Sequence, residues 1–481
     1  MRNHPLRKLF GLSPVVIAGI ALAGMAMPVR GAGFTVLTDF PQTNGDVDAL
    51  VVDPANKVVY IGGNFTTVGG KSRNHIAAIN AATGAVLDWN PNADNIVFAL
   101  VLSGTTLYAG GDFTVIGGQA RKFLAALATT TGDATMWNPN PDDGVTALAT
   151  DDTYIYASGF FTKAGGQNYQ GLTKLAISDG TAQAGWNPNP TVYSANLMTD
   201  VGIGALGLSV AGTKLYARGI FDKIGGQARY SVAQLNISDG TATAWNPNAT
   251  QGQLIYALGV SNDTVYLGGT FSTMGGQSRN NIAAVNTTDG SATSWDPNAD
   301  GIGQAFTFDG STVYVGGGFT HVGGQARSHL AALDASTGDA TEWNPGASSI
   351  YVMGVMPGST IFLGGNPFSQ VGGVARTNFA AVTENAVPPV SSSAPVVKIS
   401  GKKSVTTSQS ALTIKGTATV ADGSVAVVKV KVGKAGAKSA KGTANWSFKA
   451  KLAPGRNVIV VTATGSNGLT SQAVKISVTR R

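Results

Sequence analysis

The chain has 481 residues, 64 glycines, no cysteine and a net charge of +7. This length suggests two or three domains, and the lack of cysteine excludes disulfides, thiolate metal sites and cysteine nucleophiles. The charge is divided unevenly: residues 33–385 carry 14 basic and 25 acidic residues, whereas residues 386–481 carry 12 Lys and 3 Arg against one acid, Asp422. Such a division predicts separate domains with different partners.

Residues 1–32 have the pattern of a secretory signal peptide. Arg2, Arg7 and Lys8 form a basic n-region, followed by the apolar stretch "LFGLSPVVIAGIALAGMAM". Cleavage is expected near residues 26–32. No cysteine follows that could carry a lipid anchor, and no second apolar stretch is long enough to span a bilayer. We therefore expect an exported protein that is secreted or held at the cell surface by contacts.

Internal repetition dominates residues 33–385, which we interpret as one domain. A complete unit contains Gly-x-Phe, then Gly-Gly, then Trp before Asn-Pro or Asp-Pro, as in "YIGGNFTTVGGKSRNHIAAINAATGAVLDWNPN". The phenylalanines recur every 48 to 60 residues. They are Phe65, Phe113, Phe161, Phe221, Phe271, Phe319 and, in a variant unit, Phe368. The tryptophans are Trp89, Trp137, Trp186, Trp245, Trp295 and Trp343.

Each unit contains four short runs typical of strands, such as "VDALVVD", "KVVYIGG", "HIAAIN" and "AVLDW". Four antiparallel strands in a unit of about 50 residues predict a β-propeller blade. Seven Gly-x-Phe segments but only six tryptophan strands are present, and the opening "GFTVLTDFPQTNGDVDAL" aligns with "TGAVLDWNPNADNIVFAL". We therefore predict an all-β fold with a seven-bladed propeller, closed by an N-terminal strand that joins the last blade.

The unit "VYVGGGFTHVGGQARSHLAALDASTGDATEWNP", from Val313 to Pro345, resembles the delta-sixty repeat β-propeller family of bacterial exported proteins. The resemblance covers nearly all of residues 33–385 and implies a propeller fold. It implies no common activity, so the function has to be argued from individual sites.

The C-terminal part differs in composition from the repeats. Residues 386–397 are rich in Pro and Ser and are expected to be a linker. Residues 398–481 alternate as strands do and contain one tryptophan, Trp446, which predicts a small β-sandwich. The elements Gly-Thr-Ala, Trp-Ser-Phe and Val-Thr-Ala-Thr resemble a bacterial immunoglobulin-like module.

The lysines of this basic module allow two interpretations. Lys429 and Lys431 alternate with valines, so both are expected on the exposed face of one strand. This face either keeps the domain soluble or attracts an anionic polymer of the cell envelope. The residues assigned to such a contact are Lys429, Lys431, Lys434 and Lys438.

Two residue types repeat with the units. The tryptophans are expected to pack between blades, because packing must repeat whereas a single ligand site need not.

An arginine follows Gly-Gly in six units, and Tyr169 replaces it in the third. We expect these arginines to stack on rings or to donate to turn carbonyls, with anion binding as the alternative. They are Arg73, Arg121, Arg229, Arg279, Arg327 and Arg376.

Carboxylates precede several predicted innermost strands and are expected to gather at the mouth of a central channel. The candidates for ligand binding there are Asp46, Asp94, Asp143, Asp200 and Asp300, with Asp48 and Asp142 beside two of them. Tyr193 is a further candidate, because residues 190–204 add about ten residues between two units. No cofactor or metal site is expected, and calcium stays open without a D-x-D-x-D motif to support it.

No arrangement of nucleophile and base can be read from the sequence. We therefore expect a non-enzymatic binding or scaffold protein, with a propeller face for a protein or glycan and the basic module for attachment to the envelope. The alternative is an exported polysaccharide hydrolase or lyase with the channel-mouth aspartates as acid and base. No nucleic-acid partner is expected.

Overall fold

The computed structural model describes residues 33–191, 205–358, 360–365, 368–384, 394–420, 425–465 and 469–481. The expected signal peptide, Tyr193, Asp200 and most of the expected linker lie outside these residues. The chain divides into two compact units, Met1–Asn385 and Ala386–Arg481. All regular structure in the described ranges is β-strand, which confirms the all-β prediction.

The first unit repeats a three-stranded antiparallel sheet. In the first copy, β2 (Asp46–Asp53) pairs with β3 (Val58–Asn64), which pairs with β6 (Ile76–Asn80). The first strands of the next copies are β7 (Val97–Ser103), β12 (Val145–Thr150), β17 (Ala205–Ala211), β22 (Ile255–Ser261) and β27 (Gly303–Asp309). The second strands are β8 (Thr106–Gly111), β13 (Tyr154–Gly159), β18 (Lys214–Gly219), β23 (Thr264–Gly269) and β28 (Thr312–Gly317). The third strands are β11 (Leu124–Ala128), β16 (Leu172–Ala176), β21 (Val232–Asn236), β26 (Ile282–Asn286) and β31 (Leu330–Asp334).

The last sheet of this unit combines strands from both ends of the repeat region. Its strands are β1 (Phe34–Val36), β36 (Phe379–Glu384), β33 (Thr360–Gly364) and β32 (Val352–Met356), in this order. Because β1 pairs antiparallel with β36, the opening stretch supplies a strand to a sheet whose other strands lie more than 300 residues later.

A short hairpin follows the second strand in each copy, a feature that the sequence analysis did not predict. In the second copy, β9 (Val115–Ile116) pairs with β10 (Gln119–Ala120) around the Gly-Gly pair. Gly117 has a φ of +60°, and a Cβ there would overlap the backbone nitrogen of Ala134. Glycine therefore lets the hairpin lie against the segment that follows the third strand, where Ala134 N donates to Gly117 O at 3.0 Å.

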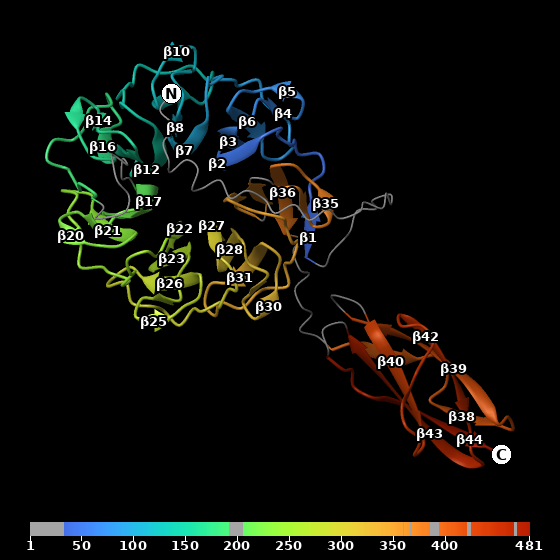
Figure 1. Cartoon of the computed structure of the whole chain (residues 1–481). Coiled ribbons are helices and arrows are strands. Elements are labelled where there is room, and N and C mark those ends of the chain that lie inside the picture. The colour runs from blue at the N-terminus through green and yellow to red at the C-terminus, as the bar shows by residue number, and fades with distance from the viewer. Residues whose placement is uncertain are drawn as a thin grey trace, which may run out of the picture. The chain divides into compact units, whose positions relative to one another are not determined.

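The other hairpins have the same two-residue strands. They are β4 (Thr67–Val68) with β5 (Lys71–Ser72), β14 (Lys163–Ala164) with β15 (Gln167–Asn168), β19 (Lys223–Ile224) with β20 (Gln227–Ala228), β24 (Thr273–Met274) with β25 (Gln277–Ser278), β29 (His321–Val322) with β30 (Gln325–Ala326), and β34 (Gln370–Val371) with β35 (Val374–Ala375). Figure 1 shows several of these hairpins at the periphery, outside the third strands.

The predicted fourth strand of each unit is reduced to one isolated bridge in six copies. In the first copy this bridge joins Val86 to Ile79. The chain then leaves its sheet, because the indole of Trp89 donates to Ala128 O of the next copy at 2.9 Å. The carbonyl of Pro91 accepts from Gly117 N at 2.7 Å, and a proline has no N–H with which to extend the sheet. The prediction of four full strands is therefore wrong for these copies.

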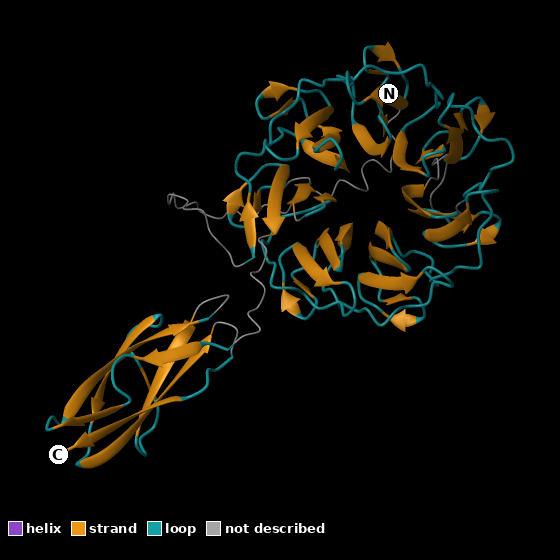
Figure 2. Ribbon diagram, turned by 180° about the vertical axis from the view of Figure 1, so that it is seen from behind, coloured by secondary structure: helices purple, strands orange, loops and turns teal. Residues whose placement is uncertain are grey.

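Hydrophobic side chains of the first unit are buried between neighbouring sheets. One cluster combines Tyr60, Ile76 and Trp89 of the first copy with Phe113 and Leu127 of the second. The first strands contact one another in succession from β2 to β32, and β32 contacts β2. Figures 1 and 2 show these strands toward a common centre and the hairpins outside them, which is a propeller-like arrangement.

The second unit contains two sheets with a common core. Trp446 is 2% exposed and packs with Ile414 of one sheet and with Val428 and Ile459 of the other, as a small β-sandwich requires. One sheet consists of β37 (Val396–Ile399), β39 (Ala411–Thr419) and β42 (Asn445–Lys451), in this order. The other consists of β38 (Ser404–Thr407), β44 (Val474–Arg480), β43 (Gly455–Gly465), β40 (Val425–Val432) and β41 (Lys438–Ser439).

Candidate functional site

The repeated tryptophans lie between neighbouring sheets, and each of the six is at most 7% exposed. The ring of Trp89 meets that of Tyr60 edge-on, with 5.1 Å between the centroids. The indole nitrogens of Trp137, Trp186, Trp245 and Trp295 donate to the next sheet as that of Trp89 does. Trp343 Nε1 has no hydrogen-bond partner among the described residues. Because these rings are buried, they pack the sheets together and leave no face for stacking on a ligand.

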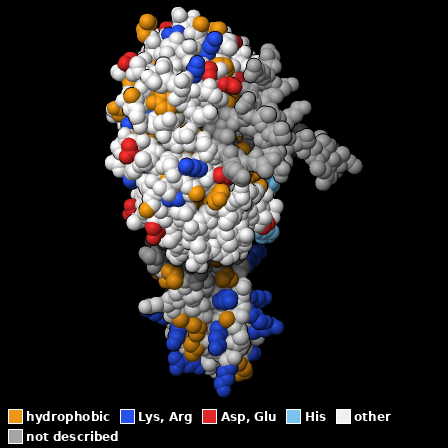
Figure 3. Space-filling model, turned by 60° about the vertical axis from the view of Figure 1, so that its left-hand side comes forward, with side chains coloured by type: hydrophobic (Ala, Val, Ile, Leu, Met, Phe, Trp, Pro, Cys, Tyr) orange, Lys and Arg blue, Asp and Glu red, His pale blue; other side chains and the backbone are white. Residues whose placement is uncertain are grey.

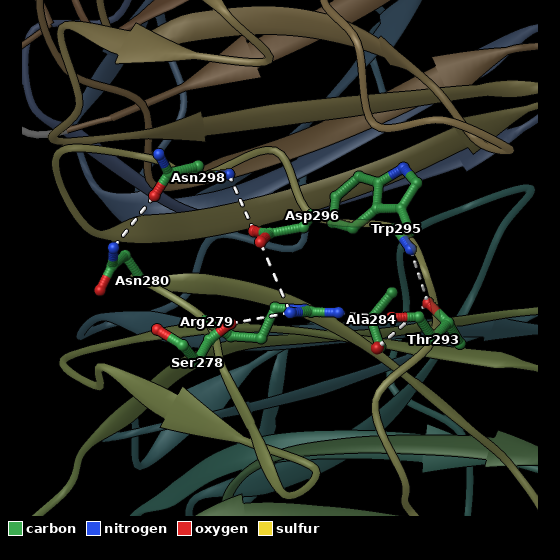
Figure 4. A network of polar contacts seen from close by, with 8 residues as sticks. All are labelled: Ser278, Arg279, Asn280, Ala284, Thr293, Trp295, Asp296 and Asn298. Carbon is green, nitrogen blue, oxygen red and sulfur yellow. Dashed lines mark hydrogen bonds and ion pairs between the residues drawn. The ribbon is translucent and has the colours of Figure 1, made fainter.

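Five of the repeated arginines hold their hairpin to the segment before the tryptophan, as Figure 4 shows for Arg279. Arg279 Nη1 donates to Ser278 O at 2.7 Å, and Nη2 donates to Thr293 O at 2.6 Å. Arg279 Nη1 also lies 3.4 Å from Asp296 Oδ2. Corresponding carbonyl bonds are made by Arg73, Arg121, Arg229 and Arg327. Arg376 instead donates to Leu37 O of the opening stretch. These bonds commit the guanidinium groups to nearby carbonyls and favour the structural interpretation.

Three of the aspartates that recur with the units accept hydrogen bonds from residues at the start of a hairpin. Asp94 Oδ1 accepts from Thr114 N at 2.7 Å and Val115 N at 3.0 Å, and Oδ2 accepts from Thr114 Oγ1 at 2.6 Å. Equivalent bonds join Asp142 to Thr162 and Lys163, and Asp300 to Thr320 and His321. Partial burial opposes ionisation, but the hydrogen bonds outweigh it and lower the pKa of all three carboxyls below the ordinary value.

Of the named aspartates that the structure describes, three are bonded to three separate hairpins. Each of these three accepts hydrogen bonds from the hairpin that follows in its own copy. Asp142, and not the candidate Asp143, corresponds in position to Asp94 and Asp300. Asp143 Oδ1 accepts from Gly144 N at 2.7 Å instead. Among the described residues, no group of three or more His, Asp and Glu could hold a metal ion.

Asp48 has the most unusual environment of the described aspartates. It lies at a β-bulge in β2, where the register shifts between Val47 and Ala49. The side chain is exposed to solvent, although β2 contacts the first strands of both neighbouring sheets, β7 and β32. Burial and, to a lesser degree, the charge of Asp46 raise the pKa of Asp48 to about 7. Burial also raises the pKa of Asp46. A carboxyl that titrates near neutrality can exchange a proton with a ligand.

A polar pocket of about 500 Å³ opens beside the hairpin β14–β15 of the third copy. Its lining includes Asn138, Asn140 and Gln167, together with the charged residues Lys163 and Asp179. These amide, ammonium and carboxylate groups donate and accept hydrogen bonds. The pocket therefore suits a polar ligand that offers both donors and acceptors, such as a sugar.

All twelve lysines of the second unit are exposed. Lys429 and Lys431 alternate with buried Val428 and Val430 in β40, as the sequence predicted. Figure 3 shows Lys and Arg side chains gathered on the surface of this unit. Four further lysines lie on the other sheet and were not predicted from the sequence, although the alternation in "FKAKL" indicated two of them. These four are Lys398, Lys415, Lys449 and Lys451.

Comparisons with known proteins do not assign the chain to a family. No protein-family model and no curated protein matches the sequence. Among solved structures, a computationally designed protein, Ika8, is 14% identical, with a TM-score of 0.44 over 72% of this chain and 98% of that chain. A fungal alcohol oxidase of the AA5 family in complex with copper is 14% identical, with a TM-score of 0.43 over 93% and 99% of the two chains.

An extracellular domain from B. thetaiotaomicron is 10% identical, with a TM-score of 0.43 over 91% of this chain and 57% of that chain. At these TM-scores the similarities carry neither a family nor an activity over to the chain. The described part of the chain also has no helix that could cross a membrane.

Proposed function

We propose that the chain is an exported binding protein that attaches to an anionic polymer of the bacterial envelope through its C-terminal unit. The observation that carries this proposal is that every lysine of this unit is exposed, while the sequence of residues 386–481 contains one acid. The positive charge is therefore almost uncompensated within the unit. Positive charge of this kind attracts polyanions over a distance of about 8 Å at physiological ionic strength.

We further propose that the seven sheets of the first unit are blades of one closed propeller, of the delta-sixty repeat type. Two observations support closure. The first strands contact one another in succession and β32 contacts β2, and the N-terminal β1 pairs with β36 of the last sheet. A closed ring removes exposed strand edges, which suits a protein that works outside the cell. The propeller then offers its surface, including the polar pocket beside β14–β15, to a protein or glycan.

Attachment is tested by sedimentation with isolated bacterial envelopes at low salt. Replacing the four lysines Lys429, Lys431, Lys434 and Lys438 with Gln should reduce the bound fraction severalfold. A matched control removes the same charge from exposed positions of the first unit that lie outside the pocket: Lys57, Lys71, Lys122 and Lys223 to Gln. The control should bind as the parent does. If the first variant binds as the parent does, attachment does not depend on these lysines.

The environment of Asp48 favours a second candidate function, hydrolysis of a polysaccharide. A carboxyl with a pKa of about 7 beside a second carboxyl is suited to act as a general acid. Asp48→Asn should then abolish the release of reducing sugar from envelope polysaccharide without lowering the melting temperature. Asp94→Asn, at a carboxyl that holds a hairpin, is the control that should keep turnover. If the parent releases no sugar from any envelope polysaccharide, the second candidate is excluded for these substrates.

A further inference from the structure

The cations of the C-terminal unit lie on two opposite faces of its sandwich. On the three-stranded sheet, Lys449 and Lys451 alternate with the buried Ala450 along β42 and point away from the core. Lys449 is opposite Thr413 of β39, and Lys415 of β39 is opposite Ser447. Together with Lys398 of β37, opposite Thr417, they form what we call the three-strand face. Its members are Lys398, Lys415, Lys449 and Lys451, all of them exposed.

The five-stranded sheet presents a second set of cations on its outer side. Lys431 of β40 is opposite Val460 of β43, which in turn is opposite Lys475 of β44. The two lysines therefore flank one residue on the same side of the sheet. Arg456 lies on this side of β43 as well, and its Nε donates to Ser477 Oγ at 3.0 Å. The five-strand face, as we call it, consists of Lys429, Lys431, Arg456 and Lys475, which are all exposed.

The two faces point in opposite directions because the hydrophobic core lies between them. Ile414 and Ala450 of one sheet pack against Val430 and Ile459 of the other within this core. Packed sheets are about 10 Å apart, and the cationic side chains extend outward from both. The two sets of charges are therefore separated by more than the screening length of about 8 Å at physiological ionic strength. One flat anionic surface can engage one face at a time.

Neither face has acids of its own sheet to neutralise it. The one acid of residues 386–481, Asp422, lies outside the described residues, and the residues opposite the cations are mainly Thr, Ser and Val. Lysine presents a hydrated point charge on a flexible stem, which suits a series of carboxylates with loose geometry better than one specific anion. This chemistry fits a polyanionic chain.

We propose that the C-terminal unit bridges two strands of anionic polysaccharide, one on each face of the sandwich. This inference rests on the proposed attachment to an anionic envelope polymer and adds that the attachment is bivalent. The protein then links polymer strands to one another and does more than anchor itself to one of them.

The test uses the full chain and beads coated with polygalacturonate, a carboxylate polysaccharide, at low salt. Bound protein is measured by depletion from solution, and bridging is measured as bead clumping by light scattering. One variant replaces the three-strand face with Gln (Lys398, Lys415, Lys449 and Lys451). A second replaces the five-strand face with Gln (Lys429, Lys431, Arg456 and Lys475). The matched control replaces four exposed cations that belong to neither face and were not assigned to the envelope contact: Lys402, Lys403, Lys441 and Arg481.

The parent and the control should bind and clump the beads. Each single-face variant should still bind but should lose clumping. Unchanged melting temperatures show that the variants are folded. The proposal is overturned if either single-face variant clumps the beads as the parent does, or if the control loses clumping to the same extent, since net charge alone would then explain the result. Binding by the parent without clumping contradicts bivalence and leaves the proposed attachment standing, whereas a lack of binding contradicts both.

Discussion

At the scale of single residues, the buried tryptophans connect one sheet to the next. Trp137 is 5% exposed, meets Tyr108 at 5.0 Å between ring centroids and donates to Ala176 O of the following sheet. Trp137→Ala should lower the free energy of unfolding by about 3–5 kcal/mol, as for other buried large aromatic residues. Chemical denaturation followed by circular dichroism measures the loss. A variant as stable as the parent would mean that this ring does not contribute to packing.

Asp142 is expected to make the fold sensitive to acid. Its pKa is lowered in the folded protein, so the ionised carboxyl contributes stability above the unfolded value of 3.8, and this contribution is lost as the pH falls below about 4. Asp142→Ala should cost about 1 kcal/mol at pH 7, since its hydrogen bonds are largely exposed. Melting temperatures between pH 3 and pH 7 measure both effects.

Asp142→Asn is the control for this prediction. In the first copy Asn44 holds the same position, and its Oδ1 accepts from Thr66 N and Thr67 N, both at 2.9 Å. The Asn variant should therefore keep most of the stability at pH 7 and lose less than the parent on acidification. An equal loss in both proteins would place the acid sensitivity elsewhere.

The sequence predicted which repeat residues are buried, because residues that recur in every unit have to serve a contact that also recurs. The sequence could not predict contacts that occur in a single copy of the repeat. Lys174 replaces the alanine found at this place in the first two copies, and only the structure shows its Nζ donating to Ile237 O at 2.7 Å and lying 3.9 Å from the centre of the Tyr154 ring. Nor could the sequence predict that Asp142, beside the candidate Asp143, makes the same bonds as Asp94 and Asp300, because spacing alone does not distinguish two neighbouring aspartates.

At the scale of elements, β1 is the strand whose role is most open to a direct test. Phe34 and Phe40 are 5% and 4% exposed. Deleting residues 33–41 from a protein that begins at residue 33 should uncover the edge of β36 and lower stability by about 3–6 kcal/mol, from the loss of two buried phenylalanines. Thermal unfolding compares the two proteins. Identical unfolding curves would contradict the contribution of β1 to the last sheet.

The strand pattern was predictable where alternation and turn residues coincide, as in β2, β3 and β6. The hairpins were not, because two-residue strands such as β9 and β10 are too short for any periodicity. The predicted fourth strand is longer than the bridge observed, because composition does not show where a strand stops pairing. A segment such as "AVLDW" has strand composition, but its tryptophan bonds to the neighbouring sheet and draws the chain away after one bridge.

At the scale of the whole molecule, the two units differ in the sign of their net charge. Residues 33–385 carry 25 acids against 14 basic residues, whereas residues 386–481 carry 15 basic residues against one acid. A negatively charged first unit is repelled by an anionic surface, so the C-terminal unit has to supply the attraction. The sequence predicted this division, but the arrangement of the cations on two faces depends on the register of the strands.

The most direct test of the account measures envelope binding at increasing salt for two proteins, the chain from residue 33 to 481 and the chain from residue 33 to 385. The longer chain should bind at low salt and be released steeply as the screening length falls from about 30 Å at 0.01 M to about 8 Å at 0.15 M. The shorter chain, once shown to be folded by its unfolding curve, should bind weakly at every salt concentration. Equal binding by both proteins, or binding by the longer chain that salt does not weaken, would contradict electrostatic attachment through the C-terminal unit.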